Sequence, residues 1–92
     1  MDARKLAKLE GELKAKRRSP QKAKGLESLA KKLGRKPAGK RGKEPVWVSG
    51  EFQLTPVSIP HHGGRDMAIG TKNAILDQLE DDMLAWEQRL SG

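Results

Sequence analysis

The sequence predicts an α+β fold in which helices cover a small antiparallel sheet. Three observations predict it: leucines with helical spacing near the N-terminal end, short apolar runs separated by turn residues in the middle, and a long apolar stripe of helical period at the C-terminal end. A chain of 92 residues can build one domain with a single modest core. Multidomain enzymes are therefore excluded.

Two helices are expected first, over residues 1–18 and 20–33. The first has a narrow apolar stripe, so we expect this helix either to dock on another element or to fray. Ser19 followed by Pro20 ends this helix and is typical of an N-cap and first position of the next one. Gly34 is the expected stop of the second helix. The apolar positions of the two helices are Leu6, Leu9 and Leu13, and then Leu26, Leu29, Ala30 and Leu33.

The middle of the chain predicts two or three short strands. Residues 35–44 are basic and contain glycine and proline, so we expect at best a short irregular edge strand that leads into a loop. Residues 46–48 and 54–59 have strand character, and residues 60–66 form a loop by composition. Trp47 alternates with two valines and faces away from them, either packing under a helix or stacking on a base.

The C-terminal part predicts the longest helix, with Thr71 as its N-cap. Its core stripe, at spacings of three and four, comprises Ile75, Leu79, Met83, Trp86 and Leu90, with Leu76 beside them. Acidic residues fall mostly outside the stripe and predict an acidic outer surface: Asp77, Glu80, Asp81, Asp82 and Glu87.

Charge is unevenly distributed along the chain. Residues 1–45 hold 16 basic and 5 acidic side chains, whereas residues 46–92 hold 3 and 7, within a net charge of +7. Such a basic surface favours a polyanion such as nucleic acid, with an anionic membrane or an acidic protein as alternatives. The sequence has no cysteine, which excludes disulfides and thiolate zinc sites, and no apolar run of about 20 residues. We expect a cytoplasmic protein that does not enter the membrane.

The second half of the sequence contains one distinctive motif in residues 57–66, Val-Ser-Ile-Pro-His-His-Gly-Gly-Arg-Asp, which precede Gly70-Thr71 and the Ile75-Leu76 pair. In this motif the chain resembles the HicA family of toxin–antitoxin proteins, and here the resemblance is specific. It is looser in residues 26–34 and in Arg41-Gly42 followed by Val46-Trp47, and it covers about residues 22–80. It implies a double-stranded-RNA-binding-domain-like α-β-β-β-α fold over residues 19–92, with residues 1–18 as an additional basic helix. It also implies an mRNA-cleaving toxin that a HicB-like antitoxin neutralises.

One position departs from the family. The family usually carries Gly-Ser-His or Gly-Gly-His at the first hairpin, and that histidine is catalytic. The matching residues here are Gly42-Lys43-Glu44, with Pro45 next. The resemblance therefore carries the fold and RNA binding to this chain more strongly than it carries ribonuclease activity.

Candidate catalytic groups come from the chemistry of RNA cleavage. Cleavage needs a base for the 2′-hydroxyl, an acid for the leaving oxygen and cations for the phosphorane. His62 matches the family's Pro-x-His position, whereas His61 is additional. Glu44 is a candidate replacement base, with Lys43 beside it to stabilise charge. The alternatives are a solvated turn histidine and a Glu44 that pairs with Lys40 or Arg41. No metal or cofactor is expected, because adjacent histidines diverge and no spaced ligand completes a site.

RNA of A-form geometry is recognised through phosphates and 2′-hydroxyls, so basic side chains on one face give affinity. The predicted RNA-binding residues are Lys36, Lys40, Arg41, Lys43, Trp47, Arg65 and Lys72. A catalytically silent RNA-binding module is the first alternative function. The second is a structural interaction protein, with residues 1–18 as a homo-oligomer contact.

Overall fold

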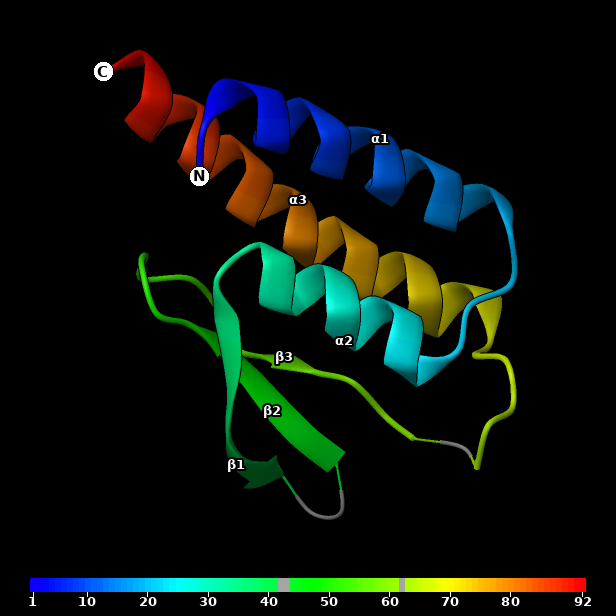
Figure 1. The fold of residues 1–92 in the computed structure, drawn as a ribbon. Coiled ribbons are helices and arrows are strands. Elements are labelled where there is room, and N and C mark those ends of the chain that lie inside the picture. The colour runs from blue at the N-terminus through cyan, green and yellow to red at the C-terminus, as the bar shows by residue number, and fades with distance from the viewer. Residues whose placement is uncertain (42–43, 62) are drawn as a thin grey trace.

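The computed structural model describes residues 1–41, 44–61 and 63–92. In these residues it contains three helices and one antiparallel sheet of three strands, so the predicted α+β class is confirmed. The elements in chain order are α1 (Ala3–Arg18), α2 (Ala23–Lys32), β1 (Arg35–Arg41), β2 (Glu44–Ser49), β3 (Val57–Ser58) and α3 (Ile69–Ser91). Figure 1 shows α1 and α3 running antiparallel, α2 next to α3, and the sheet on the side away from α1. None of the helices in the described ranges has the length and apolar character that a membrane crossing requires.

Helix α1 packs into the same core as the rest of the chain. Its N-cap Asp2 accepts a hydrogen bond from the Lys5 backbone N–H at 2.8 Å. At the other end, Arg17 pairs with Asp77 and Glu80 of α3 at 2.7 and 2.9 Å. The predicted apolar stripe is buried in the shared core cluster: Leu6, Leu9 and Leu13. The helix therefore docks within the chain, and its leucine face is buried there.

The junction between α1 and α2 differs from the prediction. Helix α2 begins at Ala23 with Lys22 as its N-cap, so Pro20 is not its first residue. Ser19 is instead the C-cap of α1. Both cap residues have an extended backbone, which the reversal of chain direction between the two helices requires. Gly34 follows α2 as predicted, with φ of +100°.

The basic segment after α2 forms a longer strand than the sequence predicts. β1 and β2 pair as an antiparallel hairpin, starting with Arg35 opposite Ser49, and a register shift midway accommodates the glycine and proline of β1. β3 is shorter than the predicted 54–59 and pairs with β2 at the far edge. Trp47 lies opposite Val57 and both are buried, so this face of the sheet lies against the helices.

Helix α3 starts at Ile69, so the prediction of Thr71 as N-cap is wrong. The N-cap is Ala68, whose carbonyl accepts from the Lys72 backbone N–H at 3.0 Å and begins the helix earlier. The buried stripe follows the prediction at Ile75, Leu76, Leu79, Met83 and Trp86. Leu90 is 39% exposed, because the last turns of α3 extend beyond α2 (Figure 1).

Candidate nucleic-acid interface

The predicted RNA-binding residues fall into groups with different surroundings. Lys36 on β1 and Arg65 in the loop before α3 are exposed, as phosphate contacts need to be. Lys40 and Arg41 lie on β1, but their side chains fall outside the described part, and Lys43 lies outside the described residues altogether. The structure therefore gives two of the seven predicted side chains an exposed position.

Trp47 and Lys72 are buried, which corrects their assignment as RNA contacts. Trp47 is 3% exposed and packs next to α2, whose Lys31 places its Nζ 5.7 Å from the ring centroid. Lys72 is 4% exposed, and its Nζ donates to the backbone carbonyls of Arg17 at 2.8 Å and Ser19 at 3.0 Å. Its charge thus faces the C-terminal carbonyls of α1, where a cation is favourable. Both side chains are parts of the architecture.

The predicted catalytic residues are not brought together in the described part of the chain. Glu44 is exposed at the start of β2 and lies opposite Arg41 in the hairpin register. It lines a groove beside the start of α3, and no other described residue of that groove is charged or a histidine. His62 and Lys43 lie outside the described residues. The arrangement around Glu44 therefore supplies one carboxylate without a described cation beside it.

A different acid–base pair joins α2 to the loop after β3. His61 Nε2 lies 2.9 Å from Glu27 Oε2, and the side chains are 53% and 17% exposed. The two residues line a surface pocket of about 380 Å³ together with Lys22, Lys24 and Arg65. Three cations, an imidazole and a carboxylate are thus concentrated at the N-terminal end of α2.

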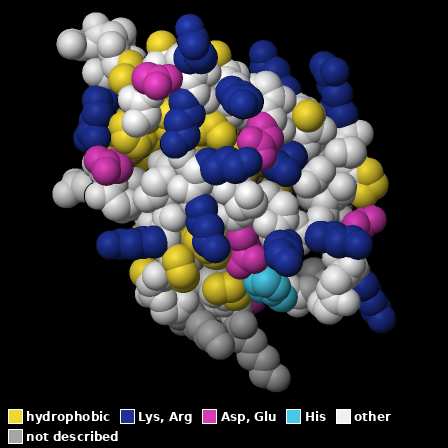
Figure 2. Space-filling model, in the orientation of Figure 1, with side chains coloured by type: hydrophobic (Ala, Val, Ile, Leu, Met, Phe, Trp, Pro, Cys, Tyr) yellow, Lys and Arg dark blue, Asp and Glu magenta, His cyan; other side chains and the backbone are white. Residues whose placement is uncertain are grey.

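The polar face of α2 extends this basic surface. Helical spacing places Lys24, Ser28 and Lys31 on one stripe, opposite the buried leucines. All three are exposed. Figure 2 shows the face on which α1 and α2 lie, where Lys and Arg side chains outnumber acidic ones and a histidine lies beside side chains of both kinds. This stripe and the His61–Glu27 pocket form what we call the basic face.

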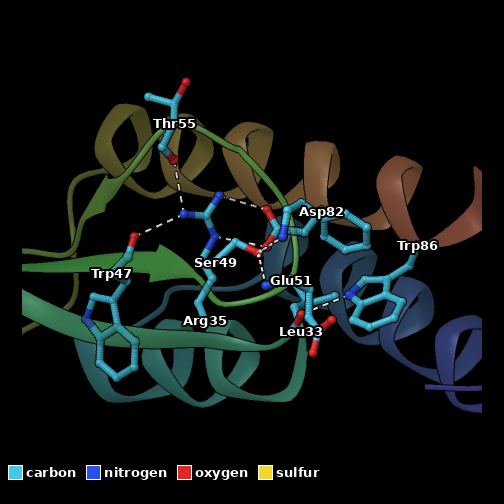
Figure 3. Close-up of polar contacts among 9 residues, drawn as sticks. Leu33, Arg35, Trp47, Ser49, Glu51, Thr55, Asp82 and Trp86 are labelled. Carbon is cyan, nitrogen blue, oxygen red and sulfur yellow. Dashed lines mark hydrogen bonds and ion pairs between the residues drawn. The ribbon is translucent and has the colours of Figure 1, made fainter. Parts of the chain in front are cut away.

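A second ion pair lies inside the molecule, between β1 and α3. Arg35 donates from Nε and Nη2 to the two carboxylate oxygens of Asp82, both at 2.9 Å, and the side chains are 1% and 0% exposed. Its Nη1 donates to the carbonyls of Trp47 and Thr55, both at 3.0 Å, as Figure 3 shows. Burial raises the pKa of Asp82, and the bonds from Arg35 oppose this rise. Asp82 is therefore not part of the acidic outer surface predicted for α3.

Sequence reasoning missed Lys22, Lys24 and Glu27 as site residues and left His61 as an additional histidine. One signal was present: Lys24 and Glu27 share the polar face of a predicted helix. Their proximity to the loop after β3 is a tertiary contact across 34 residues, as the His61 to Glu27 bond illustrates. Sequence spacing carries no information about such a contact.

Among residues 1–41, 44–61 and 63–92, no group of three or more His, Asp or Glu side chains could hold a metal ion. Comparison with protein-family models, with curated proteins and with solved structures finds no match to the chain. Function is therefore inferred from the residues of the chain and their geometry.

Proposed function

We propose that the protein is an RNA-binding toxin of a toxin–antitoxin pair, with a double-stranded-RNA-binding-domain-like unit running from α2 to α3. The observation that carries the proposal is the basic face, with exposed cations on α2, at its N-cap and in the loop before α3: Lys22, Lys24, Lys31 and Arg65. Cations arranged in this way bind phosphates without a sequence code. The element order helix, three strands, helix supports the same proposal.

The resemblance to the HicA family adds the biological setting to this proposal. In that setting the protein acts in the cytoplasm on mRNA and inhibits translation. A HicB-like antitoxin would neutralise it by covering the basic face, since masking the nucleic-acid surface is the direct route to inhibition. A catalytically silent RNA-binding module is the second candidate, and the observation that favours it is Glu44 at the hairpin position where the family has histidine.

The binding part of the proposal is tested by fluorescence anisotropy with a labelled RNA hairpin. If the four cations of the basic face each contact a phosphate, affinity falls about 100-fold between 50 and 200 mM salt. Lys24→Ala should weaken binding and flatten this salt dependence. Lys8→Ala is the matched control, because Lys8 is an exposed lysine on α1 outside the basic face. Absence of binding at 50 mM salt would overturn the proposal.

The toxin part is tested in cells. Expression of the full chain alone should arrest growth, and co-expression of the protein encoded by the adjacent reading frame should restore it. Variants of the basic face should relieve the arrest and weaken the antitoxin complex together. Normal growth with stable, abundant protein would remove the toxin assignment and leave the binding module.

A further inference from the structure

We propose that the pocket at the start of α2 is a phosphodiester-cleaving site in which His61 is the general base and Glu27 positions it. The inference rests on the proposed RNA binding and assigns the reaction to residues other than the hairpin position. Its basis is the 2.9 Å contact between His61 and Glu27 in a pocket that Lys22, Lys24 and Arg65 also line.

The contact determines which ring nitrogen is available. An ionised carboxylate can only accept, so Glu27 directs the hydrogen of the ring to Nε2, and the lone pair of an unprotonated ring then lies on Nδ1. Glu27 is mostly covered, at 17% exposure, whereas His61 is 53% exposed. A fixed carboxylate behind an accessible imidazole is the arrangement that orients a general base toward an incoming hydroxyl.

The cleavage step needs no reactant other than RNA and water. Nδ1 of His61 takes the proton of the 2′-hydroxyl, and O2′ attacks the adjacent phosphorus. The O2′–P bond forms, the P–O5′ bond breaks, and the leaving 5′-oxygen takes a proton from water. The products are a 2′,3′-cyclic phosphate and a 5′-hydroxyl, and His61 returns its proton to solvent. The cations of Lys22, Lys24 and Arg65 stabilise the charge that develops on the phosphorane.

The described groove at Glu44 does not offer the same set of groups. A carboxylate lies there without a charged or histidine partner among the described lining residues. The His61 pocket instead unites a base, a positioning carboxylate and three cations from two segments of the chain. Among the described residues, the α2 pocket is therefore the place where an imidazole, a carboxylate and cations meet.

The test uses the full chain, a 20-nucleotide single-stranded RNA and the same sequence as 2′-O-methyl RNA, in buffer with EDTA. The wild-type protein should bind both strands and cleave only the RNA, leaving 2′,3′-cyclic phosphate ends. His61→Gln keeps a hydrogen-bond donor for Glu27 but removes the base, and it should slow cleavage about 100-fold or more while the variant still binds RNA. Lys8→Ala serves again as the surface control.

Glu27→Gln tests the positioning role separately. It should slow cleavage about tenfold or more and displace the acid limb of the pH–rate profile, which a merely structural role would not move. RNA binding by the wild-type protein without cleavage, or full cleavage by His61→Gln, would overturn this site and leave the proposed RNA binding intact. Failure of the wild-type protein to bind either strand would instead contradict the proposed function itself.

Discussion

Among the acid–base pairs that connect helices to other parts of this fold, Arg35–Asp82 and His61–Glu27 lie in opposite environments. Arg35 and Asp82 are buried, and the guanidinium has four acceptors at 2.9–3.0 Å. His61 and Glu27 lie at the surface, among cations, and the imidazole has one nitrogen committed to its partner. A pair whose polar atoms are all engaged, such as Arg35–Asp82, serves the architecture, whereas a pair that keeps one group accessible, such as His61–Glu27, can serve chemistry.

The largest expected effect comes from breaking the buried pair. Asp82→Ala leaves the Arg35 guanidinium buried without its carboxylate, which should lower the free energy of unfolding by about 3–5 kcal/mol. Urea unfolding followed by circular dichroism measures the change. Asp81→Ala is the matched control, since Asp81 is the exposed neighbour, and it should change stability by less than about 0.5 kcal/mol. Equal effects of the two substitutions would contradict a structural role for the pair.

The second prediction separates buried from exposed cations. Lys72→Met removes the hydrogen bonds to the carbonyls of Arg17 and Ser19 and should cost about 1–3 kcal/mol of stability without changing RNA affinity. Arg65→Ala should weaken RNA binding without changing stability, because Arg65 is exposed on the basic face. Urea unfolding and anisotropy titration on the same protein samples check both. If folded Lys72→Met binds RNA more weakly than the wild-type protein does, Lys72 is part of the RNA interface.

The third prediction concerns the stability that the exposed pair supplies. Glu27→Gln should lower the free energy of unfolding by less than about 1 kcal/mol, because the pair is partly solvated. Asp82→Asn, the equivalent change in the buried pair, should cost several times more, which differential scanning calorimetry resolves. A Glu27→Gln protein as unstable as Asp82→Asn would show that the surface pair is also architectural.

The sequence predicts the fold more completely than the site, for physical reasons. The stripes of α1 and α3 follow from helical period, and the leucines of α1 and Trp86 are buried as expected. Arg35 lies in a segment with many basic residues, and Asp82 lies in a helix with several acidic residues. From composition alone, both side chains are expected at the surface. Their burial depends on the distance between β1 and α3, which local patterning does not encode. The pairing of His61 with Glu27 was missed for the same reason.

A third pair extends the comparison to like charges, and it carries the smallest expected effect. Glu10 on α1 faces Glu87 on α3, and a hydrogen bond between the two, burial and the charge of Glu87 raise the pKa of Glu10 above 4.5, while Lys14 lowers it. Glu80 lines the same groove. Because the folded-state pKa is the higher one, protonated Glu10 contributes its full stability below the unfolded-state value. That contribution is lost as the pH rises through the folded-state pKa.

Glu10→Gln should therefore match the wild-type protein in stability near pH 4. At neutral pH the variant should be more stable by about 0.5 kcal/mol, because the amide removes the repulsion from Glu87. Urea midpoints measured from pH 3.5 to pH 7.5 give the difference curve. Glu12→Gln is the control, and its effect on stability should have the opposite sign. Glu12 pairs with Lys32 at 3.2 Å, so the loss of this ion pair should slightly destabilise the protein at neutral pH. A pH-independent difference for Glu10→Gln would mean that the two carboxylates do not interact across the α1–α3 groove.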